Sequence, residues 1–183
     1  MTDPADAIRP LLRVRQTREF TDEPVAPDVL DAIADAARWS GSSQNSQPWR
    51  FVVIRSSDTI RRIAEAGLPQ TRSLRTATAA VAIVLPEAPG KGISNAFDEG
   101  RAAERMLIAA SYAGIAAGIA WILADVRPMV AEVLGLPGDR FVRTLVALGH
   151  PTPAARQPKS APGEARLQRE ETVFYDSWSA PKL

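Results

Sequence analysis

The uncharged stretch 107–124 restricts the fold more than any other part of the sequence. Its eighteen residues reach the length of a bilayer span, and Gly114 and Gly118 form a small-xxx-small pattern. Alanine dominates the stretch, however, and it also contains a serine and a tyrosine. We therefore expect a buried helix to about Ala113, a turn at the glycines and a core strand over 119–123, with a membrane helix as the alternative.

The totals describe one globular domain with few catalytic side chains. The chain has 183 residues, 45% of them apolar, and its formal net charge of +1 argues against a partner such as nucleic acid or an anionic membrane. The absence of cysteine excludes disulfides, thiolate nucleophiles and cysteine metal sites, and it fits a cytoplasmic location. A single histidine, His150, excludes sites that need two imidazoles, so no metal site is expected, and residues 1–9 contain no apolar signal segment.

Capping residues and apolar periodicity predict an irregular alternation of helices and strands. Asp3 and Pro4 begin one helix, and Pro27 begins a second. The remaining pattern predicts, in order, a strand over 51–54, a helix over 58–66, an irregular segment over 68–75, a strand over 79–85, a helix from Asn95 to about 113, the strand over 119–123, a helix over 126–134 and a strand over 141–148. No Gly-x-Gly-x-x-Gly, Walker or Gly-x-Ser-x-Gly motif is present, so a Rossmann dinucleotide unit is unsupported.

Two polar segments are candidates for ligand binding. The loop 40–48 offers small hydroxyls and amides between a predicted helix and a predicted strand, and Pro48 ends it in extended geometry. Arg13, Arg15 and Arg18 lie within six residues, and converging guanidinium groups would match phosphate oxygens in pairs. The alternatives are a hydrophilic connection that binds nothing and a solvated basic helix end.

The chain changes character after Leu148, where the predicted core is complete. Prolines along 151–163 indicate an extended arm that is neither helix nor central strand, and aromatic residues follow it over 174–178. Apolar side chains beyond a finished core need another apolar surface, so we expect residues 151–183 to pack on a second subunit and residues 1–150 to form the main domain. The alternative is an unattached tail.

Taken in order, these parts resemble the nitroreductase family. Residues 15–20, Arg-Gln-Thr-Arg-Glu-Phe, resemble its opening signature, and residues 40–49 resemble its hydroxyl-rich loop ending in Asn-x-Gln-Pro-Trp. Residues 98–116 resemble its central helix and glycine turn, and residues 148–151, Leu-Gly-His-Pro, resemble its Leu-Gly-Tyr/His-Pro ending. Gln16 stands where the family usually has a serine.

The resemblance implies an α+β fold: a three-layer α/β/α sandwich with a mainly antiparallel sheet, in an interlocked homodimer with FMN at the subunit interface. Carried over by position, the first chain's FMN contacts would be Arg15, Gln16, Arg18, Gln70, Ala120, Trp121, Ile122 and Arg166, with Lys159 or Arg169 as substitutes for Arg166. The partner subunit would supply its Gly41, Ser42, Ser43 and Asn45.

The implied activity is hydride transfer from NADH or NADPH, through N5 of FMN, to an electron-poor acceptor such as a nitroaromatic or a quinone, in a ping-pong cycle. Arg18 is the candidate to stabilise negative charge near N1 of the reduced flavin. No catalytic protein residue is expected, since the flavin carries the chemistry. Two alternatives stay open: a specialised enzyme of the same superfamily, of the dehalogenating, flavin-fragmenting or azoline-oxidising kind, and a non-catalytic flavin-binding dimer.

Overall fold

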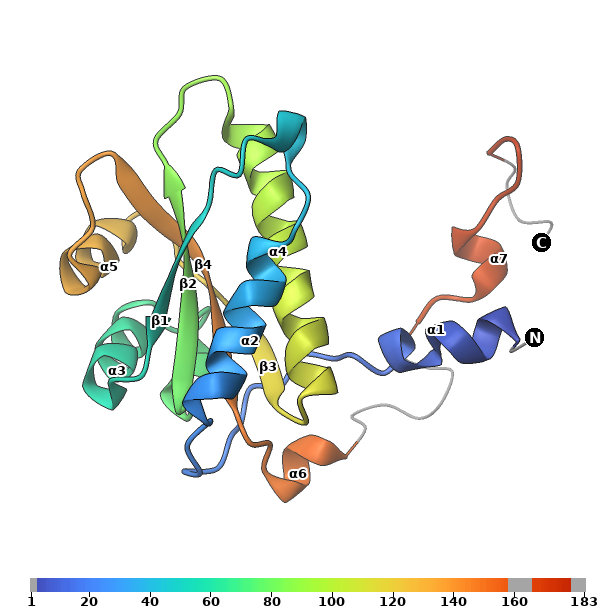
Figure 1. The fold of residues 1–183 in the computed structure, drawn as a ribbon, viewed down its shortest axis with the longest axis horizontal. Helices are drawn as coiled ribbons and strands as arrows, with labels where there is room; N and C mark the ends of the chain where they lie inside the picture. Colours follow the sequence, from blue (N-terminus) through green and yellow to red (C-terminus); the bar gives the residue numbers. More distant parts are fainter. Residues whose placement is uncertain (1–2, 158–165, 179–183) are drawn as a thin grey trace.

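The computed structural model describes residues 3–157 and 166–178, which are built around a four-stranded sheet (Figure 1). The strands are β1 (Arg50–Ile54), β2 (Ala79–Pro86), β3 (Ala116–Trp121) and β4 (Arg140–Gly149), in the spatial order β1-β2-β4-β3. All three neighbouring pairs are antiparallel, and one row of opposed residues crosses the whole sheet: Val53, Val81, Val146 and Ile119. β1 and β3 are therefore the edge strands.

Each face of the sheet carries its own layer of helices (Figure 1). Along β2, Val81 and Ile83 belong to one apolar cluster, whereas Ala80 and Ala82 belong to the other. This alternation follows from the two-residue period of a strand, and an uninterrupted apolar run such as 79–85 fits a strand buried on both sides.

In neither layer are the two helices consecutive in the sequence. The first layer consists of α2 (Pro27–Arg38) and α4 (Gly92–Tyr112), and the second of α3 (Ser57–Ala66) and α5 (Arg127–Leu134). The α/β/α sandwich with an antiparallel sheet is confirmed.

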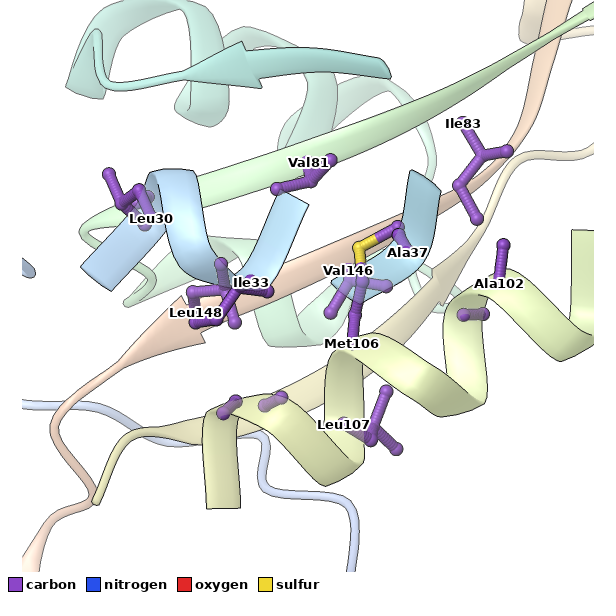
Figure 2. Close-up of a cluster of buried hydrophobic side chains, with 14 of the residues drawn as sticks. Leu30, Ile33, Ala37, Val81, Ile83, Ala102, Met106, Leu107, Val146 and Leu148 are labelled. Carbon is purple, nitrogen blue, oxygen red and sulfur yellow. The ribbon is translucent and has the colours of Figure 1, made fainter. Parts of the chain in front are cut away.

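The larger cluster lies between the sheet and the α2–α4 layer (Figure 2). Ile33 of α2 lies beside Leu148 of β4, and Met106 of α4 lies beside Val146 of the same strand (Figure 2). Helical spacing of the apolar residues on α2 and α4 produces this packing, since residues three and four apart share a face.

Three short helices lie outside this core. α1 (Pro4–Leu12) has no buried residue, although Asp3 caps it and Pro4 begins it as expected. α6 (Pro153–Arg156) follows β4, and α7 (Arg169–Thr172) lies away from the sheet on the same side as α1 (Figure 1). Among the described residues, every buried apolar side chain lies at or before Leu148, so the core is complete where the sequence predicted.

Two predicted elements had wrong boundaries, and the predicted conformation of the arm was wrong as well. β3 covers 116–121 instead of 119–123, because Gly118 is a strand residue rather than part of a turn. The long helix begins at Gly92 instead of Asn95. The arm is not uniformly extended, because Pro153 occupies the first turn of α6, where its missing N–H costs nothing, and Thr152 caps the helix. Pro158, Lys159, Pro162 and Gly163 lie outside the described residues.

The uncharged stretch 107–124 is divided between the end of α4, a turn, β3 and the residues that follow it. Across the two described ranges, no helix combines the length and apolarity that crossing a membrane requires.

Candidate functional site

The outer edge of β3 is covered by residues from the arginine segment. Gln16 forms a parallel bridge with Ala117, the Thr17 N–H donates to the Ala117 carbonyl at 2.7 Å, and the Ile119 N–H donates to Oε1 of Gln16 at 3.2 Å. Gly118 permits this approach, because a Cβ there would lie 2.0 Å from the Thr17 carbonyl oxygen. The segment 16–17 is thus fixed against the strand by backbone and side chain together.

The far end of β3 carries the next group of predicted site residues. The Trp121 N–H donates to the Gln70 carbonyl at 3.4 Å, so these two predicted residues are neighbours. Ala120 and Ile122 are buried in the second core cluster, and the Ile122 N–H donates inward to the Arg143 carbonyl of β4; the Trp121 ring is about half exposed. Gln16, Gln70 and Trp121 therefore line one edge over about four residues, roughly 13 Å of strand.

The near end of β3 opens into a pocket rich in arginine. The pocket has a volume of about 210 Å³, and three of its lining residues are Arg13, Arg15 and Arg156, with hydroxyls from Thr17 and Ser111. No described acidic residue lines it. Such a lining suits a phosphate group, because the guanidinium N–H and hydroxyl O–H groups can donate hydrogen bonds to the phosphate oxygens.

Arg15 has a second role in this pocket. Its guanidinium donates to the carbonyls of Ala155 and Gln157 at 3.2 Å each, and also to the carbonyl of Arg156. These are the orphan carbonyls at the C-terminal end of α6, so Arg15 fastens that helix beside β3. Arg18, by contrast, is exposed and makes no hydrogen bond or ion pair within the described ranges.

The polar loop is anchored on α4 by a buried carboxylate. The Ser43 N–H donates to both oxygens of Asp98, at 2.9 and 3.2 Å, and the Asp98 side chain is almost completely buried. Arg101 lies 3.8 Å from Asp98 and covers Gly41, where an added Cβ would lie 2.4 Å from its guanidinium. One turn of α4 thus holds both the backbone and the glycine of the loop.

The loop also contains a concentration of strained backbone. Gln44, Asn45 and Gln47 have φ values of 52°, 54° and 46°. These values lie in the left-handed region, which costs a residue other than glycine about 1 kcal/mol. The Gln47 N–H donates to Oγ of Ser42 at 2.9 Å, and the Gln47 amide reaches Oδ1 of Asn45 at 3.3 Å. These bonds hold the strained shape, and they direct the loop's exposed polar groups outward.

One chain does not bring the loop to the arginine pocket. The loop is anchored at Asp98, whereas the pocket is lined by Ser111, thirteen residues and about 20 Å further along α4. Figure 1 shows the loop at one end of α4 and β3 beside its other end. Arg166 is exposed in the separate C-terminal segment, and Lys159 lies outside the described residues. The predicted site residues therefore form two groups.

Sequence reasoning missed Asp98, Glu99 and Arg143 as site residues. The two carboxylates look like ordinary first-turn acids, but α4 begins earlier than predicted and both are buried. Glu99 pairs with Arg143, whose guanidinium lies over the Trp121 ring at 5.6 Å. The one available signal was Arg143 itself, the single charge in the run 141–148, which is apolar except for Arg143 and Thr144.

Comparisons with known proteins agree with this architecture. The nitroreductase family model matches residues 13–83, the region that contains the arginine segment and the polar loop. A relative from Archaeoglobus fulgidus, whose name couples NADH dehydrogenase with NAD(P)H nitroreductase, is 29% identical over 143 residues, covering 75% of this chain and 80% of that protein. The nitrobenzene nitroreductase of Ectopseudomonas oleovorans is 37% identical over 59 residues, which cover 32% and 26% of the two chains.

Solved structures extend the similarity to nearly the whole chain. The NADPH:FMN oxidoreductase from Vibrio harveyi, solved with NAD+, has a TM-score of 0.79 at 22% identity and covers 96% of this chain and 79% of its own. An FMN-dependent nitroreductase from Clostridium difficile has a TM-score of 0.78 at 19% identity, with 93% and 99% covered. The chain is thus similar to the nitroreductase family in sequence over residues 13–83 and in fold over nearly its whole length.

Proposed function

We propose that the protein is an FMN-dependent oxidoreductase that takes hydride from NADH or NADPH and passes it to an electron-poor acceptor, such as a nitroaromatic or a quinone, in a ping-pong cycle. The observation that carries this proposal is the arginine-lined pocket that continues directly into the covered edge of β3. The relatives named for NAD(P)H nitroreductase and FMN-dependent activity support the same conclusion.

The donor set of this region fits FMN. Arg13, Arg15 and Arg156 would hold the phosphate, and Arg166 with Lys159 or Arg169 would complete that site from the C-terminal segment. The amides of Gln16 and Gln70 and the backbone of 120–122 would border the isoalloxazine ring. When bound, FMN would supply the hydride chemistry, and no side chain of the protein is required as an acid or a base.

Arg18 is the residue proposed to act on the electronics of the ring. Its guanidinium is exposed and has no partner among the described residues, so it remains available for a ligand oxygen. A fixed positive charge near N1 and the C2 carbonyl favours the reduced, anionic ring. Arg18→Ala should lower FMN occupancy or slow flavin reduction, and wild-type values for both would remove Arg18 from the site.

A homodimer would unite the two groups of site residues. The pocket in one chain is smaller than the roughly 300–1,000 Å³ typical of ligand sites, so part of the enclosure must come from elsewhere. The outer side of α4 and the arms expose large apolar side chains, including Ile93, Phe97, Leu12, Tyr175 and Trp178. A second chain covering them would bring its own loop, with Gly41, Ser42, Ser43 and Asn45, to the flavin.

Truncation after Pro151 tests the role proposed for residues 151–183. Because the buried apolar residues of the described chain end at Leu148, the shortened protein should still fold, yet elute as a monomer without FMN. A truncated protein that remained a yellow dimer would contradict the packing of this arm on the partner.

The absorbance of the purified protein, followed by anaerobic titration with NADPH, tests the function itself. The flavin bands should appear in the purified protein and bleach on titration with NADPH, then return when a nitroaromatic or a quinone is added. A yellow protein that keeps its absorbance over minutes would instead be a non-catalytic flavin-binding dimer. Turnover restricted to a dehalogenation, an azoline oxidation or breakdown of the flavin would identify one of the specialised alternatives.

Gly118 offers a matched pair of variants for the proposed site. Gly118→Ala would force the Thr17 carbonyl away from β3, so the FMN dissociation constant should rise by about tenfold or more and occupancy should fall, since displacing several contacts costs over about 1.4 kcal/mol. Gly138→Ala is the control, because nothing lies within 4 Å of the added atom. Equal occupancy in both variants would show that the covered edge of β3 is not part of the flavin site.

A further inference from the structure

Arg143 lies at an irregularity in the pairing of β2 with β4. β2 and β4 are paired in register as far as Ile83 and Thr144, and pairing resumes at Val84 and Val142, which leaves Arg143 as an extra residue. A β-bulge of this kind changes the direction of a side chain. Here it sends a guanidinium from a central strand to α4.

The target on α4 is Glu99. Nε of Arg143 donates to Oε2 of Glu99 at 2.8 Å, and Nη2 donates to the same oxygen. The side chains are only 16% and 3% exposed, so the pair is shielded from water. Breaking such a pair leaves a buried charge uncompensated, which fixes the guanidinium far more firmly than a surface pair would.

Arg143 contacts the end of β3 in two ways, through its fixed guanidinium and through its backbone carbonyl. The guanidinium lies over the Trp121 ring, 5.6 Å from its centre, and the Arg143 carbonyl accepts a hydrogen bond from the Ile122 N–H at 2.7 Å. Phe141 flanks the same guanidinium at 6.0 Å. The ring of Trp121 is thus restrained by a residue that is itself locked to a different layer of the fold.

We infer that the Glu99–Arg143 pair is a positioning device for Trp121, and that it sets how tightly the flavin ring is held at this end of β3. The inference rests on the proposed function, because it assumes that FMN lies along this edge. Glu99 and Arg143 act through Trp121 and are therefore positioning residues. A pair that only stabilised the fold would change the melting temperature but would have no specific connection to Trp121.

A double-mutant cycle on FMN affinity separates the two roles. Glu99→Gln, Trp121→Phe and the double variant are titrated with FMN as full-length apoproteins, and the dissociation constant is read from quenching of flavin fluorescence. Each single change should raise the constant by about tenfold, and the double change should raise it no more than the larger single one. A double variant near the product of the two effects, about a hundredfold, would overturn the inference.

Asp35→Asn provides the control for this cycle. Asp35 pairs with Arg38, whose guanidinium lies over Trp39, so the variant releases a guanidinium from an indole in the same way at the surface. Its FMN dissociation constant should equal that of the wild type. An equal rise in Asp35→Asn and Glu99→Gln would show that the effect of Glu99 is nonspecific.

Arg143→Lys keeps the test decisive if Glu99→Gln does not fold. Lysine preserves the charge and the pairing with Glu99 but cannot present a flat guanidinium to the ring. Acrylamide quenching of Trp121, taken as the difference from the same protein carrying Trp121→Phe, should rise in Arg143→Lys; unchanged quenching would overturn the inference. A wild-type protein that bound no FMN would instead end the proposed function, whereas wild-type binding with unaltered Glu99→Gln affinity would end only the positioning role.

Discussion

The molecule contains two groups of carboxylate, guanidinium and indole that differ mainly in where they lie. Asp35, Arg38 and Trp39 are close in sequence on α2, with Nε of Arg38 2.9 Å from Oδ1 of Asp35 and the guanidinium 5.4 Å from the ring centre. Glu99, Arg143 and Trp121 repeat these distances at 2.8 and 5.6 Å, but each residue comes from a different element.

The two groups differ in their exposure to solvent and in the elements that they connect. The Arg38 and Asp35 side chains are 59% and 65% exposed, so water and salt screen their attraction, and the pair joins residues that one helix already holds together. The Glu99–Arg143 pair is buried and connects α4 to β4 and, through Trp121, to β3, three elements that lie far apart in the sequence. The two groups have similar distances, but only the buried group joins different layers of the fold. Only that group can therefore pass a displacement from one layer to another.

The largest effect expected to sharpen this comparison is on stability. Glu99→Ala should lower the free energy of unfolding by about 3–5 kcal/mol, because Arg143 would remain buried without a partner. Asp35→Ala should lower it by about 1 kcal/mol or less. Urea denaturation of both variants measures the two values, and similar losses would remove the distinction drawn between the groups.

A smaller effect is expected when the arginines become lysines. Arg143→Lys should cost about 1–2 kcal/mol, since it loses one of two charge-assisted hydrogen bonds and the flat contact with Trp121. Arg38→Lys should stay within about 0.5 kcal/mol, as is usual for surface substitutions. Chemical denaturation under identical buffer conditions provides the measurement, and a loss at Arg38 as large as that at Arg143 would contradict the assignment.

The smallest effect is the response to salt. In 1 M NaCl the Debye length falls to about 3 Å, so any destabilisation caused by Asp35→Ala should disappear. The destabilisation caused by Glu99→Ala should persist, since the ions cannot reach the pair. Denaturation curves of both variants at low and high salt decide the point; a Glu99→Ala penalty that vanished with salt would mean that the pair is effectively solvated.

The same contrast explains what the sequence could predict. The Asp35–Arg38 pair follows from helical spacing, and the cap at Asp3 and the first-turn proline Pro27 located the first two helices for the same local reason. The Glu99–Arg143 pair spans 44 residues and depends on a bulge between β2 and β4, for which no local pattern exists. Long-range polar contacts of this kind were accordingly missed.

Gly118 and Pro153 show why some boundaries were misplaced. Gly118 suggested a turn, yet its missing Cβ serves the close approach of Thr17, which is a tertiary contact. Pro153 suggested the absence of helix, yet it begins one. The polar loop and the arginine segment were recognised from composition, but their separation along α4 appears only in three dimensions. Their use as one flavin site remains a prediction.

The early completion of the core has a consequence for how the chain matures. Translation adds roughly 5–20 residues per second, and domains fold from the N-terminus as they emerge. Among the described residues, those after Leu148 add no buried apolar side chain, so the sheet and its helices can pack without them. The sheet and its helices can therefore fold before two chains associate, and the proposed dimer would form from folded subunits rather than from unfolded chains.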